Sequence, residues 1–374
     1  MNKVDVIELT RKLISFNTVS LPGNEGIAAK YVGEILLANG FGIKYHPFKG
    51  DKSRLSLIAE KGIKEGQPPI IFTGHFDTVP VGKSDWGTDP FKAEIIGDKM
   101  YGRGSTDMKA GVAAIVSAAI EAFNENDNAH GVRLILTASE ELGCEGAADL
   151  VSSVDYLGDA SAIIVGEPTS NIPAIAHKSS LYLEASATGK TAHSSMPHLG
   201  DNAIYKVARA ISKIEKFDFG VEEDELLGYP TINVGVVEGG QNLNSVPDKA
   251  GFTIDIRSTS KLDNTEALNM LKKELGDEID LKVIVNNSSV YNYTESDFEK
   301  LVYKLCGMSG SCPDRRKALP YMTDGSALQT FYKGIPTIIM GPGEAKQAHK
   351  TNEFCYVSNI HEAVEIYKNI IIQY

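Results

Sequence analysis

The stretch Ile70-Ile71-Phe72-Thr73-Gly74-His75-Phe76-Asp77-Thr78-Val79-Pro80 decides the fold class of this 374-residue chain. It begins as an apolar run of β-branched and aromatic residues, which is typical of a buried strand, and continues into two polar residues, His75 and Asp77. Side chains alternate in direction along a strand, so these two residues leave it on the same face. Asp77 can then reach the ring nitrogen of His75 that is not used for a ligand. The alternative is a structural histidine, hydrogen-bonded at the end of a strand.

Strands and helices alternate on both sides of this stretch. Three further β-rich runs are Ser56–Ala59, Leu134–Thr137 and Ala162–Val165. Helical spacing of apolar residues predicts helices at residues 4–16, 24–39 and 108–123. Strands that alternate with helices form a largely parallel sheet with both faces covered. The sequence therefore predicts an α/β domain with a mixed, mostly parallel sheet.

The pattern changes after residue 177. Between residues 178 and 291, alternating strands and two helices give an α+β texture, and the α/β texture resumes after Asn292. An inserted segment of this length matches the commonest size of a domain. We therefore predict a discontinuous α/β domain of residues 1–177 and 292–374, with residues 178–291 as an inserted α+β domain.

Composition limits the classes of partner. The chain has 37 Lys and Arg against 49 Asp and Glu, a net charge of −12, which disfavours nucleic acid or an anionic membrane and suits cationic ligands such as metal ions. The four cysteines form no C-x-x-C pair and are expected to be reduced thiols. No apolar run has the length of a signal peptide core or a spanning helix, so we expect a cytoplasmic protein.

Histidine and acidic residues occur where several of these elements begin or end. Each has a simpler explanation when taken alone, such as a helix N-cap for Asp107 or a solvated strand end for the two adjacent glutamates. However, ligands bind outside the carboxyl ends of strands in open α/β sheets, and mixed nitrogen and oxygen ligands suit Zn²⁺ or a similar divalent ion. The sequence thus predicts a metal site, with room for two ions if one carboxylate bridges. The candidates are His75, Asp107, Glu140, Glu141, Glu167 and His349.

The chain resembles the M20 metallopeptidase family, which includes acetylornithine deacetylase, succinyl-diaminopimelate desuccinylase, aminoacylase and related carboxypeptidases. The resemblance implies a zinc-peptidase-like α/β catalytic domain. It also implies that residues 178–291 are a lid and dimerisation domain, through which the chain forms a homodimer. Seven motifs in the family's order carry it: Gly74–Pro80, Tyr101–Gly111, Ser139–Gly143, Gly166–Thr169, Gly189–Ile204, Gly239–Pro247 and Ala348–Glu353.

The resemblance further implies two divalent metal ions bridged by Asp107. The remaining ligands of one ion are His75 and Glu167, and those of the other ion are Glu141 and His349. Zinc is the expected metal, and cobalt or manganese is the alternative, because these ligand types do not distinguish them.

Catalytic roles are also implied by the resemblance. Glu140 is the general base, a choice between two adjacent glutamates that the sequence by itself leaves open. Asp77 is a further catalytic residue, and His193 in the inserted domain reaches the substrate oxygen, from the partner subunit in dimeric relatives. A cis peptide bond is implied between Asp107 and Met108.

Substrate contacts are expected in two places. Asn244 and Arg257 match residues of the lid that hold the substrate, and a guanidinium can donate two parallel hydrogen bonds to a carboxylate. An ion pair with Asp255 is the alternative role of Arg257. The loop that contains Thr323 and Ser326 is expected to border the substrate.

These observations predict a two-metal hydrolase that cleaves the amide bond of an N-acyl amino acid, similar to acetylornithine deacetylase or succinyl-diaminopimelate desuccinylase. The same metals and base also suit an exopeptidase or dipeptidase, so a short peptide is the alternative substrate. A non-catalytic protein that binds metal or an amino acid is a third interpretation.

Overall fold

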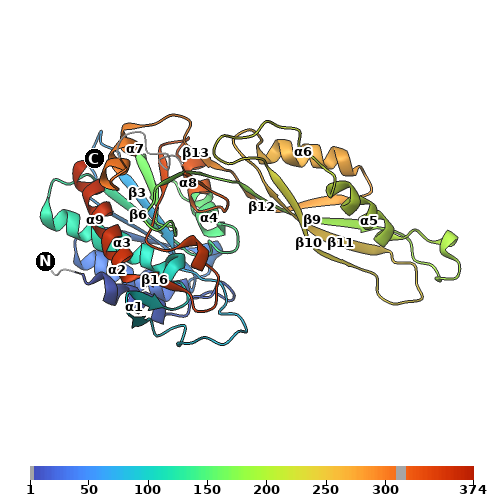
Figure 1. Cartoon of the computed structure of the whole chain (residues 1–374), viewed down its shortest axis with the longest axis horizontal. Coiled ribbons are helices and arrows are strands. Elements are labelled where there is room, and N and C mark those ends of the chain that lie inside the picture. Colours follow the sequence, from blue (N-terminus) through green and yellow to red (C-terminus); the bar gives the residue numbers. More distant parts are fainter. Residues whose placement is uncertain (1–3, 309–316) are drawn as a thin grey trace. The chain divides into compact units, whose positions relative to one another are not determined.

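The computed structural model describes residues 4–308 and 317–374, and within these ranges the chain divides into two compact units (Figure 1). The larger unit comprises Met1–Ala176, Val290–Lys317 and Thr323–Tyr374. The inserted unit comprises His177–Ser289 and Ala318–Met322. No helix within the described ranges is long and apolar enough to cross a membrane. Cys312 lies outside these ranges, and the other three cysteines are free.

The larger unit is built on a mixed sheet with a parallel centre. The path through it is β1-β2-β6-β3-β7-β15-β8-β13, in which β3 runs parallel to both β6 and β7, and β15 runs parallel to β7. The strands are β1 (Gly42–Pro47), β2 (Leu55–Lys61), β3 (Ile70–His75), β6 (Val132–Thr137), β7 (Ala162–Val165), β8 (Ala174–His177), β13 (Val290–Tyr291) and β15 (Thr337–Ile339). The short strand β14 (Lys317–Leu319) crosses the boundary between the units.

Helices cover this sheet because its central strands have no polar face. Every residue of β3 and β6 is buried, as expected for parallel strands with helices on both sides. The Ala-rich helix α3 packs against β3 and against α9, and most of its residues are buried. The helices of this unit are α1 (Val6–Ser15), α2 (Glu25–Ala38), α3 (Ala110–Glu125), α4 (Glu145–Ser153), α7 (Asp297–Leu305), α8 (Gly325–Phe331) and α9 (Val357–Gln373).

A small antiparallel sheet, β4-β5-β16, joins segments that are far apart in the chain. It consists of β4 (Glu94–Ile96), β5 (Lys99–Tyr101) and β16 (Phe354–Tyr356). Strand β5 precedes the loop that carries Asp107, and β16 follows the turn that carries His349. The pairing of β16 with β5 therefore brings two predicted metal-binding segments side by side.

The inserted unit is a four-stranded antiparallel sheet in the order β10-β11-β9-β12, with two helices packed on it. Burial alternates along β11, so one face of the sheet packs against the helices. Asn202 caps the first helix by accepting hydrogen bonds from two backbone N–H groups. The elements are β9 (Ser180–Thr188), α5 (Ala203–Ile214), β10 (Thr231–Gly239), β11 (Lys249–Arg257), α6 (Asn264–Leu275) and β12 (Asp280–Asn287).

The structure confirms the α/β prediction and its mostly parallel sheet. It also removes one alternative, because α3 begins at Ala110 and Asp107 is not its N-cap. Asp107 instead lies in an irregular turn, and the Asp107–Met108 peptide bond is cis, as predicted. The start of α3 approaches the end of β7 so closely that a Cβ atom at Gly111 would lie 2.2 Å from the carbonyl oxygen of Gly166.

Candidate metal centre

His75 is delivered by the end of the central strand β3. Its side chain is buried, and its Nδ1 atom lies 2.9 Å from the backbone oxygen of Asp77. Its Nε2 atom points into a group of carboxylates, 3.2 Å from Oδ1 of Asp107 and 3.7 Å from Oε1 of Glu167. A histidine with one ring nitrogen fixed by the backbone and the other facing carboxylates has the arrangement of a metal ligand.

Asp107 lies between two histidines. Its Oδ1 atom faces His75, and its Oδ2 atom lies 3.3 Å from Nε2 of His349. The same nitrogen of His349 is 3.0 Å from Oε2 of Glu141. One carboxylate therefore connects a histidine from the sheet with a histidine from a distant turn, which is the geometry that a bridging ligand requires.

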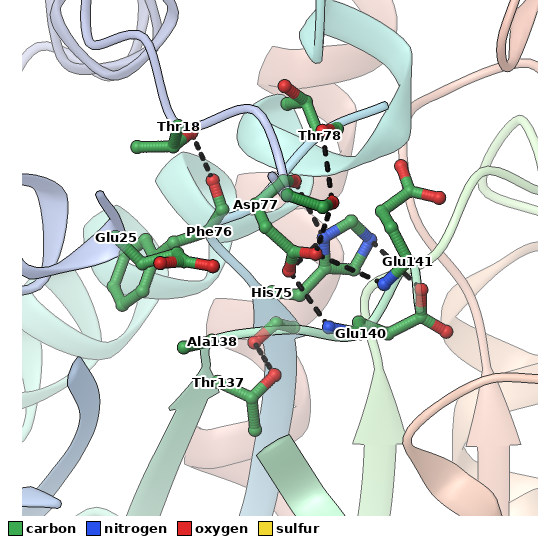
Figure 2. A network of polar contacts seen from close by, with 12 residues as sticks. Thr18, Glu25, His75, Phe76, Asp77, Thr78, Thr137, Ala138, Glu140 and Glu141 are labelled. Carbon is green, nitrogen blue, oxygen red and sulfur yellow. Dashed lines mark hydrogen bonds and ion pairs between the residues drawn. The ribbon is translucent and has the colours of Figure 1, made fainter. Parts of the chain in front are cut away.

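Asp77 holds the turn that follows β6. Its two carboxylate oxygens accept hydrogen bonds from the backbone N–H groups of Glu140 and Glu141, at 2.9 Å and 3.1 Å (Figure 2). Nδ1 of His75 lies 3.4 Å from Oδ1 of Asp77, farther than it lies from the backbone oxygen of the same residue. The Asp77 carboxylate thus contacts both the ring of His75 and the backbone of the two adjacent glutamates.

The pKa values reflect crowding of carboxylates in a buried place. Burial raises the pKa of Glu140 and of Glu167 well above the ordinary value, and neighbouring carboxylates add to this effect. Burial lowers the pKa of His75, but its contacts with Asp107 and Asp77 more than compensate, so its pKa lies well above the ordinary value. Contacts with Asp107 and Glu141 raise the pKa of His349 to about 10. The surroundings therefore favour a positive charge among these side chains.

The residues fit divalent metal ions. Oε1 of Glu141 is buried and has no hydrogen-bond partner among the residues that the structure describes. Within the described ranges, three groups of three residues place a ligand atom of each member within 4.8 Å of the others, and two of these groups contain His75: His75 with Asp107 and Glu141, and His75 with Glu140 and Glu167. Imidazole and carboxylate groups suit zinc and similar ions. Because both adjacent glutamates reach the cluster, its geometry leaves open which one is a ligand and which is the base.

The candidate residues of the inserted unit occupy two separate places. Oγ of Ser195 lies 2.8 Å from Nδ1 of His193, and the backbone of this loop pairs with the loop that carries Asn244. Arg257 ends strand β11, where its guanidinium contacts Asp255 and the hydroxyl of Tyr182. The ion pair considered as an alternative role of Arg257 is thus present, and His193 and Asn244 lie near the other end of that strand.

Thr323 and Ser326 are buried at the start of α8 in the larger unit. Oγ1 of Thr323 accepts a hydrogen bond from the backbone N–H of Gly325, whereas Oγ of Ser326 has no partner among the described residues. The role of these hydroxyls in substrate binding stays a prediction.

Three residues near the cluster were missed by the sequence analysis. Sγ of Cys144 donates to Oε1 of Glu140 at 3.3 Å, and Asp324, which accepts from Thr137, belongs to the same buried group. Glu353 is fully buried and accepts hydrogen bonds from the loop that carries Asp107. Glu353 ends the quoted motif Ala348–Glu353, and Asp324 lies between Thr323 and Ser326, so their positions beside candidate residues were the available signal.

Histidines and carboxylates that converge at the edge of an α/β sheet define a metal-dependent hydrolase, and comparisons with known proteins specify the family. Residues 71–373 match Peptidase family M20/M25/M40. The chain belongs to this family, and it is a metal-dependent enzyme that acts on amide or peptide bonds. This confirms the predictions of the family and of the enzyme class.

Relatives cover almost the whole chain. A probable succinyl-diaminopimelate desuccinylase of Staphylococcus epidermidis is 31% identical over 100% of this chain and 98% of its own length. An acetylornithine deacetylase of Pasteurella multocida is 30% identical over 91% of this chain and 90% of its own. The crystal structure of a tripeptidase from Staphylococcus aureus has a TM-score of 0.76 with 23% identity, over 99% of this chain and 98% of that one. The last comparison establishes the fold alone.

Proposed function

We propose that the protein hydrolyses the amide bond of an N-acyl amino acid whose acyl group is acetyl or succinyl. The observation that carries this proposal is the convergence of His75, Asp107, Glu141, Glu167 and His349 around Glu140. The choice of substrate is supported by relatives about equally similar over nearly full length that are named as a desuccinylase and a deacetylase.

Two divalent ions, zinc first among the candidates, would be held by the residues of this cluster. His75 and Glu167 would hold one ion, Glu141 and His349 the other, and Asp107 would contact both. When bound, the ions supply Lewis acidity for the amide carbonyl and for the attacking water. The position of Asp107 between the two histidines supports this assignment.

Glu140 would act as the general base. Its Oε2 atom lies 4.0 Å from Nε2 of His75, and its Oε1 atom is held by the thiol of Cys144, so the carboxylate is oriented from both sides. Asp77 fixes the backbone on which this side chain stands. Glu140 would take a proton from the attacking water and pass it to the leaving amine, and His193 would donate a hydrogen bond to the oxyanion.

Arg257 and His193 support a homodimer. Arg257 is the last residue of β11, whereas the first residue of that strand, Lys249, pairs with the end of β9 that leads into the His193 loop. The first and last of the nine strand residues lie about 26 Å apart at roughly 3.3 Å per residue, which exceeds the length of an N-acyl amino acid. If Arg257 binds the substrate carboxylate and His193 the oxyanion, the two must come from different copies of the chain.

Mixing two inactive variants tests this dimer. Homodimers of Glu140→Ala and of His193→Ala should each turn over substrate at least about 100-fold more slowly than wild type. After subunit exchange in an equal mixture, about a quarter of the wild-type activity should return, because half of the dimers are mixed and each has one intact site. Mixed dimers that form but remain inactive would contradict the assignment of His193 to the partner's site.

A substrate panel tests the reaction. Zinc-loaded enzyme is assayed with N-acetyl and N-succinyl derivatives of ornithine, diaminopimelate and neutral amino acids, and with dipeptides and tripeptides of the same residues. The proposal expects the largest kcat/KM for one acyl amino acid. A larger kcat/KM for a peptide would favour the exopeptidase alternative. A tripeptidase shares this fold, so peptides belong in the panel.

A further inference from the structure

Glu353 lies at the end of the turn that carries His349, and both of its carboxylate oxygens are used within the protein. Oε1 accepts hydrogen bonds from the backbone N–H groups of Thr106 at 2.7 Å and Asp107 at 3.1 Å. Oε2 accepts from the backbone N–H of Gly104 at 3.0 Å and from the guanidinium of Arg103 at 2.5 Å. With four donors on two oxygens and no solvent exposure, this carboxylate is not placed to be a metal ligand itself.

The donors belong to the loop that presents Asp107. This loop is irregular: Gly104 has φ +83°, and Asp107 and Met108 have non-helical backbone angles. Regular secondary structure therefore does not satisfy these backbone N–H groups, and a buried N–H group without a partner is costly. Glu353 provides the missing acceptors, and hydrogen bonds from N–H groups to a charged acceptor are stronger than those to a neutral one.

Further contacts join the same two segments. The backbone N–H of Gly102 donates to the carbonyl oxygen of Glu353 at 3.0 Å, and the hydroxyl of Thr106 donates to the carbonyl oxygen of Phe354 at 2.7 Å. Arg103, which balances the charge of Glu353, also donates to the carbonyl oxygen of Pro80. The Asp107 loop is thus attached to the His349 turn by side-chain and backbone hydrogen bonds.

His349 depends on this attachment more than His75 does. His75 stands on a buried strand and is fixed by the sheet, whereas His349 lies in a turn with φ +62° and its side chain is 55% exposed. Neither His349 nor Asp107 belongs to a strand of the main sheet. Glu353, four residues after His349, connects the Asp107 loop to this turn.

We propose that Glu353 is a positioning residue that holds Asp107 against His349, so that the two can bind one metal ion together. This inference rests on the ligand roles in the proposed function, but not on the identity of the substrate. Loss of Glu353 should selectively weaken the ion shared by Asp107, Glu141 and His349, because His75 and Glu167 keep the support of β3 and β7.

Zinc binding by Glu353→Gln is the test, measured by titration calorimetry and equilibrium dialysis on the full-length protein. The variant should bind one of two zinc ions about 10-fold to 100-fold more weakly than wild type, the usual effect of removing a group that orients a ligand. Its kcat should fall in proportion to the lost ion while KM stays nearly unchanged. Two zinc ions bound with wild-type affinities would overturn the proposal.

Two further variants keep the result interpretable. Glu60→Gln is the matched control, because it also removes a carboxylate from a buried arginine, Arg133. Arg133 lies near the start of β6, whereas Glu140 follows its end, so zinc binding should be unchanged. If Glu353→Gln does not fold, as judged by circular dichroism, Thr106→Val removes a second contact between the same two segments without a charge change, the hydrogen bond from the Thr106 hydroxyl to the carbonyl oxygen of Phe354. It should weaken one zinc ion several-fold, and unaltered affinity would count against the proposal. A wild-type protein inactive on every acyl amino acid would refute the proposed function but leave this zinc measurement valid.

Discussion

The candidate residues of the larger unit converge, whereas those of the inserted unit are dispersed. In the larger unit, His75 and Glu167 follow neighbouring strands, and Asp107 lies beside them on a loop whose backbone donates hydrogen bonds to Glu353. In the inserted unit, Arg257 is the last residue of β11, whereas His193 follows the end of β9 that pairs with the first residue of β11. The difference teaches that the larger unit has its candidate residues assembled before substrate arrives, whereas under the proposed function those of the inserted unit would meet only around a substrate in a dimer.

Removal of metal should have the largest effect. Dialysis against a chelator should abolish hydrolysis, because the remaining carboxylates repel one another and cannot polarise the amide. Adding zinc should restore turnover, and metal content measured alongside activity checks this. Full turnover in protein shown to be free of metal would contradict the assignment of the chemistry to a metal centre in the larger unit.

Substitution of Glu140 and of Glu141 should affect different properties, turnover in one case and zinc binding in the other. Glu140→Gln should lower kcat by roughly 10²-fold to 10⁴-fold, the usual contribution of a general base, without loss of bound zinc. Glu141→Gln should instead lower the amount of zinc bound. Zinc analysis and kinetics on both variants decide the matter, and exchanged results would mean that the two roles are reversed.

A residue of the inserted unit should affect turnover but not metal. His193→Ala should lower kcat by about 10²-fold to 10³-fold, the cost of losing one donor to an oxyanion, with both zinc ions retained. Ser195→Ala, which removes the hydroxyl beside Nδ1 of His193, is the milder control. A loss of zinc from His193→Ala would show that the units do not divide their tasks in this way.

Arg257 should affect binding of the substrate. Arg257→Lys keeps the charge but cannot donate two parallel hydrogen bonds, so KM should rise roughly tenfold with a small change in kcat. Arg209→Lys, which alters an exposed ion pair with Glu278 in the same unit, should leave both constants unchanged. An unaltered KM for Arg257→Lys would favour the purely structural ion pair with Asp255.

The last prediction concerns the stability of the fold and not turnover. His177 is fully buried, Nε2 has no hydrogen-bond partner among the described residues, and burial lowers its pKa to about 4. The unfolded chain takes up a proton at this residue near pH 6.5 and the folded chain does not, so the free energy of unfolding should fall as the pH drops from about 6.5 to 4. This group alone accounts for about 3 kcal/mol over that window.

Urea unfolding at several pH values checks this expectation. His177→Gln cannot titrate, so its stability should depend less on pH than that of wild type across the same window. Identical pH dependence of the two proteins would show that His177 is protonated as readily in the folded state as in the unfolded state.

The α/β fold and most candidate ligands could be predicted from the sequence because their signals are local. The apolar run before His75 has the period and composition of a buried strand, and Glu140 and Glu167 follow runs of the same kind. The position of Asp107 after a glycine-rich turn was equally visible. Its role was ambiguous, since an N-cap has the same sequence pattern, and only the start of α3 at Ala110 excludes it.

Contacts between distant segments were beyond reach of the sequence. Arg103 and Glu353 are 250 residues apart, and nothing near either residue indicates that they pair. The Asp77 carboxylate was expected to contact the histidine ring, and it does; that it also accepts hydrogen bonds from the backbone N–H groups of Glu140 and Glu141 was not predicted. Which N–H groups a buried carboxylate accepts from depends on which of them regular secondary structure leaves without a partner, and this is known only from the folded chain.

The sequence by itself determined which side chains stand at the ends of strands, because periodicity and burial are written into neighbouring residues. Tertiary structure decided which of them meet. Asp107 lies between His75 and His349 because two loops and a small sheet bring the C-terminal turn to it. Whether a carboxylate faces a metal site or supports the backbone behind it depends on the donors around it, and those donors come from segments that only folding brings together.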